Sequence, residues 1–298
     1  MSIAWVFPGQ GSQKIGMADS VSSLNGASER FDFASNLLGR NLLEICQGNS
    51  QDLGQLDDLN DTRNTQPAMF LVQSLLIDDL KRQGRKPSLV AGHSLGEIAA
   101  LYAAEVFDFE NALSLLKVRS ELMASAGGGA MTAVMGFNQK LLFEIVQETE
   151  GVVIANDNSS EQVVLSGTPA GVNAVIDKIE CKRSIALNVS GAFHSPFMSE
   201  AAKSFSIELD KIEFKDALCP VSSNVDPIPT KEGSLLKLKL NKQMISGVRW
   251  RETMDVFQQQ RINTLVEIGP GKVLSGLAKR SLKEITITQV SSLNDLGY

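Results

Sequence analysis

One short pattern, between residues 88 and 100, constrains this chain more than any other part of its sequence. Residues 89–91 form an apolar run that suits a buried parallel strand, and Gly92-His93-Ser94-Leu95-Gly96 follows, leading into a run of helix formers. A Gly-x-Ser-x-Gly pattern between a strand and a helix predicts a sharp turn with the serine in a strained conformation. The glycines permit this turn because a Cβ at either position would crowd a neighbouring element. We therefore expect the Ser94 hydroxyl at the C-terminal edge of a sheet, above a helix N-terminus that favours negative charge.

The pattern also has an ordinary explanation. Five residues with two variable positions arise often by chance. The strand-like and helix-like segments around them favour a nucleophilic serine, but such a serine also needs a base, an oxyanion hole and a substrate pocket. Other parts of the chain have to supply these groups.

The choice of base is narrow because the chain contains two histidines, His93 and His194. An imidazole suits general base catalysis at neutral pH. His93 is adjacent to Ser94, and its side chain should point away from the serine at the turn. His194 is therefore the candidate base, although a single histidine taken alone is more often a core or surface residue.

The composition argues against several classes of function. With 298 residues the chain is long enough for one large domain or two. The formal net charge of −6 argues against nucleic acid or an anionic membrane surface as the main partner. The first residues lack the charged and apolar regions of a signal peptide, so we expect none, and no apolar run is long enough to cross a bilayer. Cys46, Cys181 and Cys219 are odd in number and widely spaced, which suggests no metal or disulfide framework and a reducing, cytoplasmic location.

Helical and strand patterns alternate along the chain, as is typical of α/β proteins. Strand residues 3–7 lead into a glycine-rich turn at residues 8–13, and helical patterns cover residues 28–46 and 109–126. An amphipathic helix is predicted from residue 65 to residue 83, with Pro67 in its first turn. Towards the C-terminus we predict helices at residues 198–209, 235–244, 250–260 and 272–282, and strands at residues 221–225, 264–268 and 285–290.

Three consecutive glycines, residues 127–129, mark a boundary after which the order of elements changes. The following segments predict a β-α-β-β-α-β order, which is ferredoxin-like. We therefore predict a small subdomain at residues 127–191, inserted into a larger domain formed by residues 1–126 and 192–298. Its predicted strands are residues 130–137, 152–155, 162–165 and 184–189, its helices are residues 139–149 and 169–179, and a polar loop occupies residues 156–160.

Motifs dispersed over nearly the whole chain make it resemble bacterial malonyl-CoA:acyl carrier protein transacylases and the acyltransferase domains of fatty-acid and polyketide synthases. Each motif is weak alone, but their combination and order are specific. The resemblance implies an α/β-hydrolase-like parallel-sheet core with an inserted ferredoxin-like subdomain, in agreement with the element order. The motifs are residues 7–13 (FPGQGSQ), 65–68 (TQPA), 92–97 (GHSLGE), Arg119, 158–159 (NS), 162–167 (QVVLSG), 191–196 (GAFHSP), Gln243 and 269–274 (GPGKVL).

The resemblance implies transfer of a malonyl group from malonyl-CoA to the phosphopantetheine thiol of holo-acyl carrier protein. The route is ping-pong through a malonyl-serine, and the product supplies fatty-acid biosynthesis, with a polyketide pathway left open. No tightly bound cofactor, no metal, no nucleic acid and no membrane partner are expected, and the chain is expected to be a monomer.

The resemblance also implies catalytic roles. Ser94 is the expected nucleophile and His194 its base, in a Ser-His dyad whose imidazole is oriented by a backbone carbonyl near Gln243. The backbone N–H of Leu95 is one expected oxyanion donor, as elbow geometry requires. The resemblance implies that Gln10 supplies the second donor.

Selection of the acyl group is expected to depend on Arg119. A guanidinium forms a planar two-point pair with a carboxylate, such as the free carboxylate of a malonyl group. Phe193 resembles the bulky residue of malonyl-selective relatives, where an α-methyl group would clash.

Two other classes of function remain open at this point. A serine esterase or thioesterase shares the elbow, the base and the oxyanion hole, and differs in passing the acyl group to water. In such hydrolases the catalytic residues usually follow the chain order Ser, Asp or Glu, His, which would put an acid between Ser94 and His194. Asp157 and Asp177 lie in that interval, neither in a convincing motif. A non-enzymatic α/β binding protein is the third class.

Overall fold

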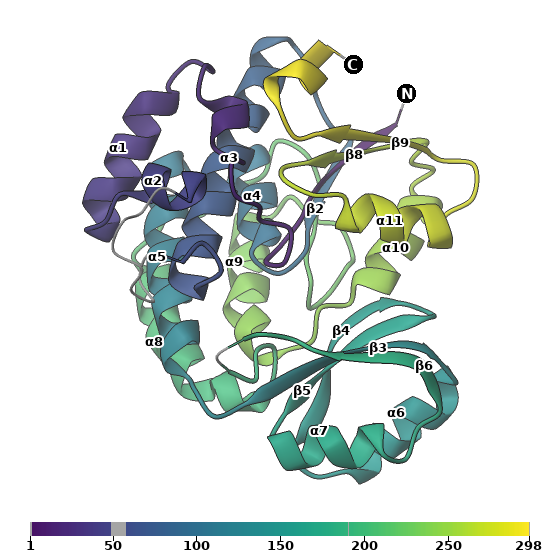
Figure 1. Ribbon diagram of the computed structural model, residues 1–298. Coiled ribbons are helices and arrows are strands. Elements are labelled where there is room, and N and C mark those ends of the chain that lie inside the picture. Colours follow the sequence, from purple (N-terminus) through teal and green to yellow (C-terminus); the bar gives the residue numbers. More distant parts are fainter. Residues whose placement is uncertain (1, 49–57, 190, 298) are drawn as a thin grey trace.

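The larger sheet carries the segment expected to hold the serine. The computed structural model describes residues 2–48, 58–189 and 191–297, and within these ranges the larger sheet has five parallel strands in the order β7-β2-β1-β8-β9 (Figure 1). Because all the strands run in one direction, the turns that follow β1, β2 and β8 meet at one edge of the sheet. The strands are β1 (Ile3–Phe7), β2 (Leu89–Gly92), β7 (Val221–Ser222), β8 (Thr264–Ile268) and β9 (Thr286–Val290).

Helices cover both faces of this sheet (Figure 1). Alternate residues of a strand point to opposite faces, so Trp5 and Phe7 enter one core and Ala4 and Val6 enter another. The first core is shared with α1 (Ala27–Leu38), α2 (Leu42–Gln47), α3 (Thr62–Arg82), α4 (Gly96–Ala103), α5 (Phe109–Ser125), α8 (Ser199–Asp210) and α9 (Gly233–Lys242), and the second with α10 (Trp250–Gln259) and α11 (Val273–Ser281).

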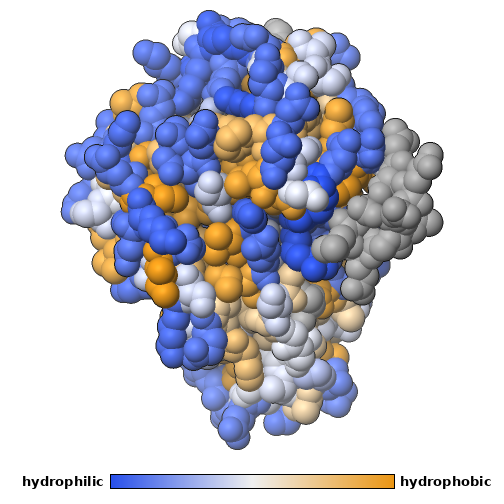
Figure 2. All heavy atoms as spheres, turned by 90° about the vertical axis from the view of Figure 1, so that its left-hand side faces the viewer, coloured by the Kyte–Doolittle hydropathy of each residue, from blue (hydrophilic) through white to orange (hydrophobic). Residues whose placement is uncertain are grey.

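A second sheet forms the smaller lobe, at the bottom of Figure 1 and the narrow end of Figure 2. Its antiparallel strand order, β4-β5-β3-β6, interleaves two β-α-β units, and its helices cover a separate apolar core. The predicted element order therefore agrees with the structure, while the boundaries at residues 127 and 191 stay a prediction, and Ser190 lies outside the described residues. The elements are β3 (Ala130–Phe137), α6 (Gln139–Glu148), β4 (Val152–Ser159), β5 (Gln162–Gly167), α7 (Pro169–Ile176) and β6 (Cys181–Ala186).

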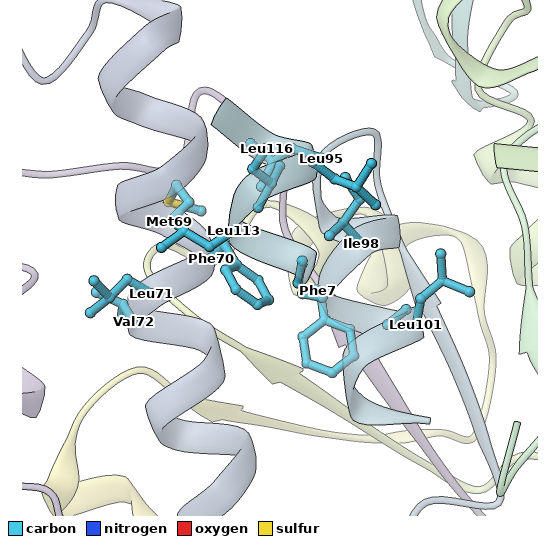
Figure 3. Packing of buried hydrophobic residues seen from close by; sticks show 14 of the residues in the cluster. Phe7, Met69, Phe70, Leu71, Val72, Leu95, Ile98, Leu101, Leu113 and Leu116 are labelled. Atoms are coloured by element: carbon cyan, nitrogen blue, oxygen red, sulfur yellow. The ribbon is translucent and has the colours of Figure 1, made fainter. Parts of the chain in front are cut away.

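The helix that follows the predicted serine turn is fixed by packing on both sides. Figure 3 shows Ile98 and Leu101 of α4 close to Phe7 of β1, with Phe70 of α3 next to them. All four side chains are fully buried. A rigid helix in this position holds the turn that precedes it.

The helix predicted from residue 65 begins earlier than expected. It starts at Thr62, where the side chain of Asp61 caps it by accepting from the backbone N–H of Arg63. Pro67 therefore lies in the second turn and cannot donate to the carbonyl of Arg63. Arg40 donates to that carbonyl instead, at 2.8 Å, so a contact from outside the helix compensates for the proline.

The loop predicted at residues 156–160 is wrong, because β4 continues to Ser159 with two shifts of register. Asn and Asp favour turns in isolation. Here the backbone N–H of Asp157 donates to the carbonyl of Val248, and the Asp157 carboxylate binds the guanidinium of Arg251. These contacts with the larger lobe hold the segment extended.

Two other boundaries differ from prediction. The helical pattern at residues 28–46 is divided between α1 and α2, because Gly39 adopts a left-handed φ of 69° and ends α1. The last strand of the smaller sheet is Cys181–Ala186 rather than residues 184–189. Between them, the described helices include none that is both long and apolar enough to span a membrane.

Candidate active site

The turn between β2 and α4 has the predicted strained geometry. Ser94 has a φ of 54°, in the left-handed region that residues with a side chain rarely adopt. A Cβ on Gly92 would lie 1.9 Å from the carbonyl oxygen of Gly96, and a Cβ on Gly96 would lie 2.1 Å from the carbonyl oxygen of Phe7. Both positions therefore require glycine, and the Ser94 side chain projects from the edge of the sheet.

His194 lies against this serine. Its Nε2 is 2.7 Å from the Ser94 Oγ, and its Nδ1 is 2.9 Å from the backbone carbonyl oxygen of Gln243. A carbonyl oxygen can only accept a hydrogen bond, so Nδ1 carries the proton. Nε2 is then free to accept the serine proton, which is the arrangement that a general base requires.

The surroundings of His194 keep its ring neutral. Burial lowers the pKa of His194 to about 3, and the nearby positive charge of Arg119 contributes in the same direction. The hydrogen bond to Gln243 opposes this effect. At neutral pH the imidazole is therefore available as an acceptor.

Arg119 is buried beside the serine. Its Nη2 donates to the Ser94 Oγ at 3.2 Å and to the side-chain oxygen of Gln243 at 2.9 Å, and its Nη1 donates to the side-chain oxygen of Gln66 at 2.7 Å. Burial lowers the pKa of Arg119 to about 10, so the side chain remains charged at neutral pH. The site thus contains one fixed cation within hydrogen-bonding distance of the nucleophile.

Two backbone N–H groups are available to a developing oxyanion. Leu95 follows the serine, and Gln10 lies in the turn after β1. Within the residues that the structure describes, neither N–H has a hydrogen-bond acceptor. The side chain of Gln10 donates elsewhere, to the hydroxyl of Thr62 at 3.1 Å.

A small cavity of about 90 Å³ adjoins the serine. Both lobes contribute to it, since Met131 and Asn156 come from the smaller sheet and Met123 comes from α5. All the predicted site residues except Gln243 line this cavity, together with Phe193.

The other candidate groups lie elsewhere. His93 bonds through Nε2 to the side-chain oxygen of Asn158 at 2.8 Å and does not contact the serine hydroxyl. Asp157 pairs with Arg251, and Asp177 ends α7 in the smaller lobe, so neither carboxylate orients His194. In the described ranges no group of three or more His, Cys, Asp or Glu side chains could hold a metal ion.

Three buried polar residues around the site received no role from the sequence. Gln66 holds Arg119, while Asn224 accepts from the backbone N–H of Ser94 at 2.8 Å and donates to the carbonyl oxygen of Gly92 at 2.6 Å. Glu97 accepts from the side-chain amide of Gln243 at 2.7 Å. Gln66 and Glu97 belong to the motifs quoted from the sequence. Asn224 lies within the predicted strand at residues 221–225 and just after the observed strand β7, and this place near the edge of the sheet was the available signal.

A serine on such a turn, bonded to a neutral imidazole at the edge of a parallel sheet, defines the class of enzymes that carry an acyl group on serine. The chain belongs to the acyl transferase domain family, whose sequence model matches residues 4–296.

Solved and curated relatives agree with this membership. The chain is 48% identical to the malonyl CoA-acyl carrier protein transacylase of Synechocystis sp. PCC 6803 over 100% of this chain and 99% of the relative, and 38% identical to the Bacillus subtilis protein of the same name over 98% and 95%. The crystal structure of the Synechocystis enzyme superposes with a TM-score of 0.94, at 47% identity, covering 100% and 99% of the two chains. A type II polyketide synthase acyl carrier protein in complex with its malonyl-transacylase matches with a TM-score of 0.91, at 34% identity, covering 99% of this chain and 98% of that chain.

Proposed function

We propose that this acyltransferase moves a malonyl group from malonyl-CoA to the phosphopantetheine thiol of acyl carrier protein, through a malonyl ester on Ser94. The observation that carries the proposal is the position of the Ser94 Oγ, 2.7 Å from the His194 Nε2 and 3.2 Å from the Arg119 Nη2. A base and a carboxylate-binding cation thus meet at one nucleophile. The names of the relatives support both the donor and the acceptor.

In the first half-reaction, the Nε2 of His194 accepts the proton of the Ser94 hydroxyl while Oγ attacks the thioester carbonyl. The carbonyl oxygen becomes negative and is stabilised by the N–H groups of Leu95 and Gln10. The intermediate collapses with cleavage of the C–S bond. The coenzyme A thiolate takes the proton from His194 and leaves as the thiol.

The second half-reaction uses the same groups in reverse. The thiol of the carrier's phosphopantetheine arm gives its proton to the Nε2 of His194, and its sulfur attacks the ester carbonyl. The C–O bond to Ser94 breaks, and the proton returns to Oγ. The carbonyl oxygen of Gln243 holds the imidazole in one orientation through both steps.

Arg119 selects the acyl group in this proposal. A malonyl group on Ser94 carries a free carboxylate one methylene group beyond the ester carbonyl, close to the guanidinium. A charge-assisted pair forms there, and an acetyl group would leave the buried cation without it.

The names of the relatives leave the pathway open. Some are named as malonyl CoA-acyl carrier protein transacylases with no pathway stated. Another is a polyketide biosynthesis transacylase of Bacillus subtilis, at 37% identity. We assign the product to fatty-acid biosynthesis as the first candidate. The reaction as written uses no tightly bound cofactor, and a monomeric, cytoplasmic enzyme remains part of the proposal.

The test is transfer of label from radiolabelled malonyl-CoA with and without holo-acyl carrier protein. We expect label on the carrier, and on the enzyme when the carrier is omitted. Release of free malonate at the same rate with or without the carrier would instead identify a hydrolase. Ser94→Ala should carry no label, and Ser125→Ala, which changes an exposed serine of α5, should behave as the unmodified chain.

A further inference from the structure

A buried carboxylate behind the active site has no part in the reaction described above. Glu97 lies in the first turn of α4, three residues after Ser94, and is fully buried. We propose that Glu97 is a positioning residue and the resident counter-ion of Arg119, and that it sets how strongly the site holds an acyl group with a free carboxylate. The proposal rests on the proposed malonyl transfer.

The connection between the two charges runs through one side-chain amide. Arg119 donates from Nη2 to the oxygen of the Gln243 amide at 2.9 Å, and the nitrogen of that amide donates to the Oε2 of Glu97 at 2.7 Å. An amide has its acceptor and its donor at opposite ends, so the cation and the anion fix its orientation. The same nitrogen lies 2.9 Å from the carbonyl oxygen of Ser94. The chain of contacts thus joins the carboxylate, the cation and the turn of the nucleophile.

Glu97 lies where an anion would balance the charge of Arg119. Burial raises the pKa of the Glu97 carboxyl, while its hydrogen bonds with Gln243 and Asn224 and the charge of Arg119 lower it. Arg119 is fully buried, and its hydrogen-bond partners Gln66, Ser94 and Gln243 are neutral. A buried guanidinium without an opposite charge is strongly unfavourable. Among the described residues, Glu97 is the acid whose field favours the charged form of Arg119. The backbone N–H of Asn224, at 3.2 Å, supplies Glu97 with a second donor.

Malonyl binding adds a second anion to the same cation. In the acyl-enzyme the malonyl carboxylate and Glu97 both face Arg119, and two carboxylates that share one cation repel each other. Glu97 therefore weakens the hold on malonyl and prevents the malonyl-serine from becoming too stable to react with the carrier thiol. An acetyl group has no carboxylate and does not experience this repulsion.

Glu97→Gln in the full chain tests this role, because it removes the charge and nearly preserves the shape. We expect the KM for malonyl-CoA to fall about tenfold and transfer from the malonyl-enzyme to the carrier to slow by about the same factor, as for loss of one nearby like charge. Free malonate should raise the melting temperature of the variant more than that of the unmodified chain. Acetyl transfer should change little. Glu105→Gln, which changes a half-exposed glutamate just after α4, is the matched control.

Glu97→Asp provides the second variant, in case removal of the charge prevents folding. It keeps the negative charge but draws it away from the Gln243 amide, so Arg119 loses its fixed orientation. We expect the ratio of malonyl to acetyl transfer to fall about tenfold, and malonate should raise the melting temperature less than in the unmodified chain. An unchanged ratio in this variant would overturn the proposal.

Equal malonyl KM values and equal malonate responses in Glu97→Gln and the unmodified chain would also overturn it, because Glu97 would then be a neutral structural group. Failure of the proposed function would give a different experimental result. The unmodified chain would then move no malonyl label to the carrier, while the malonate melting experiment would still test the link between Glu97 and Arg119.

Discussion

The Nη2 of Arg119 lies 3.2 Å from the Oγ of Ser94, although the two residues are separated by 25 positions along the chain. Helix α5 brings them together by packing against α4 and α3. The cation is therefore within reach of any acyl group attached to the serine. In the proposed reaction, recognition of the acyl group and its transfer use one hydrogen-bonded cluster.

Arg119→Ala should change the preference for the acyl group. We expect malonyl transfer to fall about tenfold to a hundredfold, the range for loss of a hydrogen bond to a charged group. Acetyl transfer should stay level or rise, because the buried cation no longer requires a partner. Rates with malonyl-CoA and acetyl-CoA against one holo-carrier, read by intact-protein mass, measure both effects.

Arg82→Ala is the control for this experiment, since Arg82 lies at the exposed end of α3 and pairs with Asp79. It should leave both rates unchanged. An equal loss for malonyl and acetyl in Arg119→Ala would contradict the role in selection and would indicate a structural arginine.

Gln10→Ala should harm transfer much less than Ser94→Ala. The proposed contribution of Gln10 is its backbone N–H, which alanine retains, although the contact between its side chain and Thr62 is lost. We expect a loss of less than about tenfold, against about a hundredfold to a thousandfold for Gln10→Pro, which removes the donor. Steady-state rates of the two variants, with melting temperatures to confirm folding, decide whether the N–H group matters.

Much of the fold could be predicted because local patterns and packing agree. Strands β8 and β3 begin and end at the predicted residues. Each is a mainly apolar segment with turn-forming or polar residues at its ends. The extension of β4 through residues 156–159 could not be predicted. Its polar residues favour a turn locally, and the contacts that override this preference come from Val248 and Arg251, far away in the sequence.

The candidate site, like the fold, could be predicted only in part from the sequence. The turn at Ser94 follows from its glycines and flanking elements, and the two histidines leave a short list of bases. The buried partners of Arg119 could not be derived in this way, because nothing local shows that Gln66 on α3 and the side chain of Gln243 converge on α5. Resemblance to known transferases supplied Arg119 itself, and the network behind it required three-dimensional structure.

His194 should remain neutral at pH values where a free imidazole titrates. Burial lowers the pKa of His194 to about 3 and lowers that of His93 also. With two histidines in the chain, ¹⁵N-edited NMR of the imidazoles can follow each one. We expect His194 not to titrate between pH 5 and about 8, with its proton on Nδ1, and His93 to titrate at a lower pH than a free imidazole. A ring that titrates near its ordinary pKa would contradict the buried dyad.

The same shifts affect stability at acidic pH. Between about pH 6.5 and the folded pKa of about 3, the unfolded chain binds protons that the folded chain excludes. The free energy of unfolding should therefore fall as the pH falls through this window, and the two histidines should contribute nothing above it. Urea unfolding at pH 7 and about pH 5 measures the change. In His93→Asn the loss between the two pH values should be smaller.

The ion pair between Asp157 and Arg251 should stabilise the contact between the two lobes. Asp157 is nearly buried and accepts from both Nε and Nη2 of the guanidinium. Asp157→Asn should lower the free energy of unfolding by about 1 to 3 kcal/mol, as for a charged hydrogen bond with a buried partner. Glu252→Gln, which breaks the exposed pair with Arg249, should cost less than about 1 kcal/mol. Equal effects in urea unfolding would show that burial adds nothing to this pair.

Two glycine substitutions should have opposite effects, because their surroundings differ. A Cβ at Gly92 would lie 1.9 Å from the backbone oxygen of Gly96, so Gly92→Ala must displace the turn that carries Ser94. We expect Gly92→Ala to lose malonyl loading and to lower the free energy of unfolding by about 2 kcal/mol or more, as for other strained or overpacked sites.

Gly276 lies inside α11, where a Cβ would meet no atom closer than 3.6 Å. Gly276→Ala should raise the free energy of unfolding by about 0.5 to 1 kcal/mol, since alanine restricts the unfolded chain and favours the helix. Urea unfolding of both variants, together with malonyl-serine formation followed by mass, tests the pair. If Gly92→Ala still forms malonyl-serine at the rate of Gly276→Ala, the close approach at the turn is not what holds the nucleophile in place.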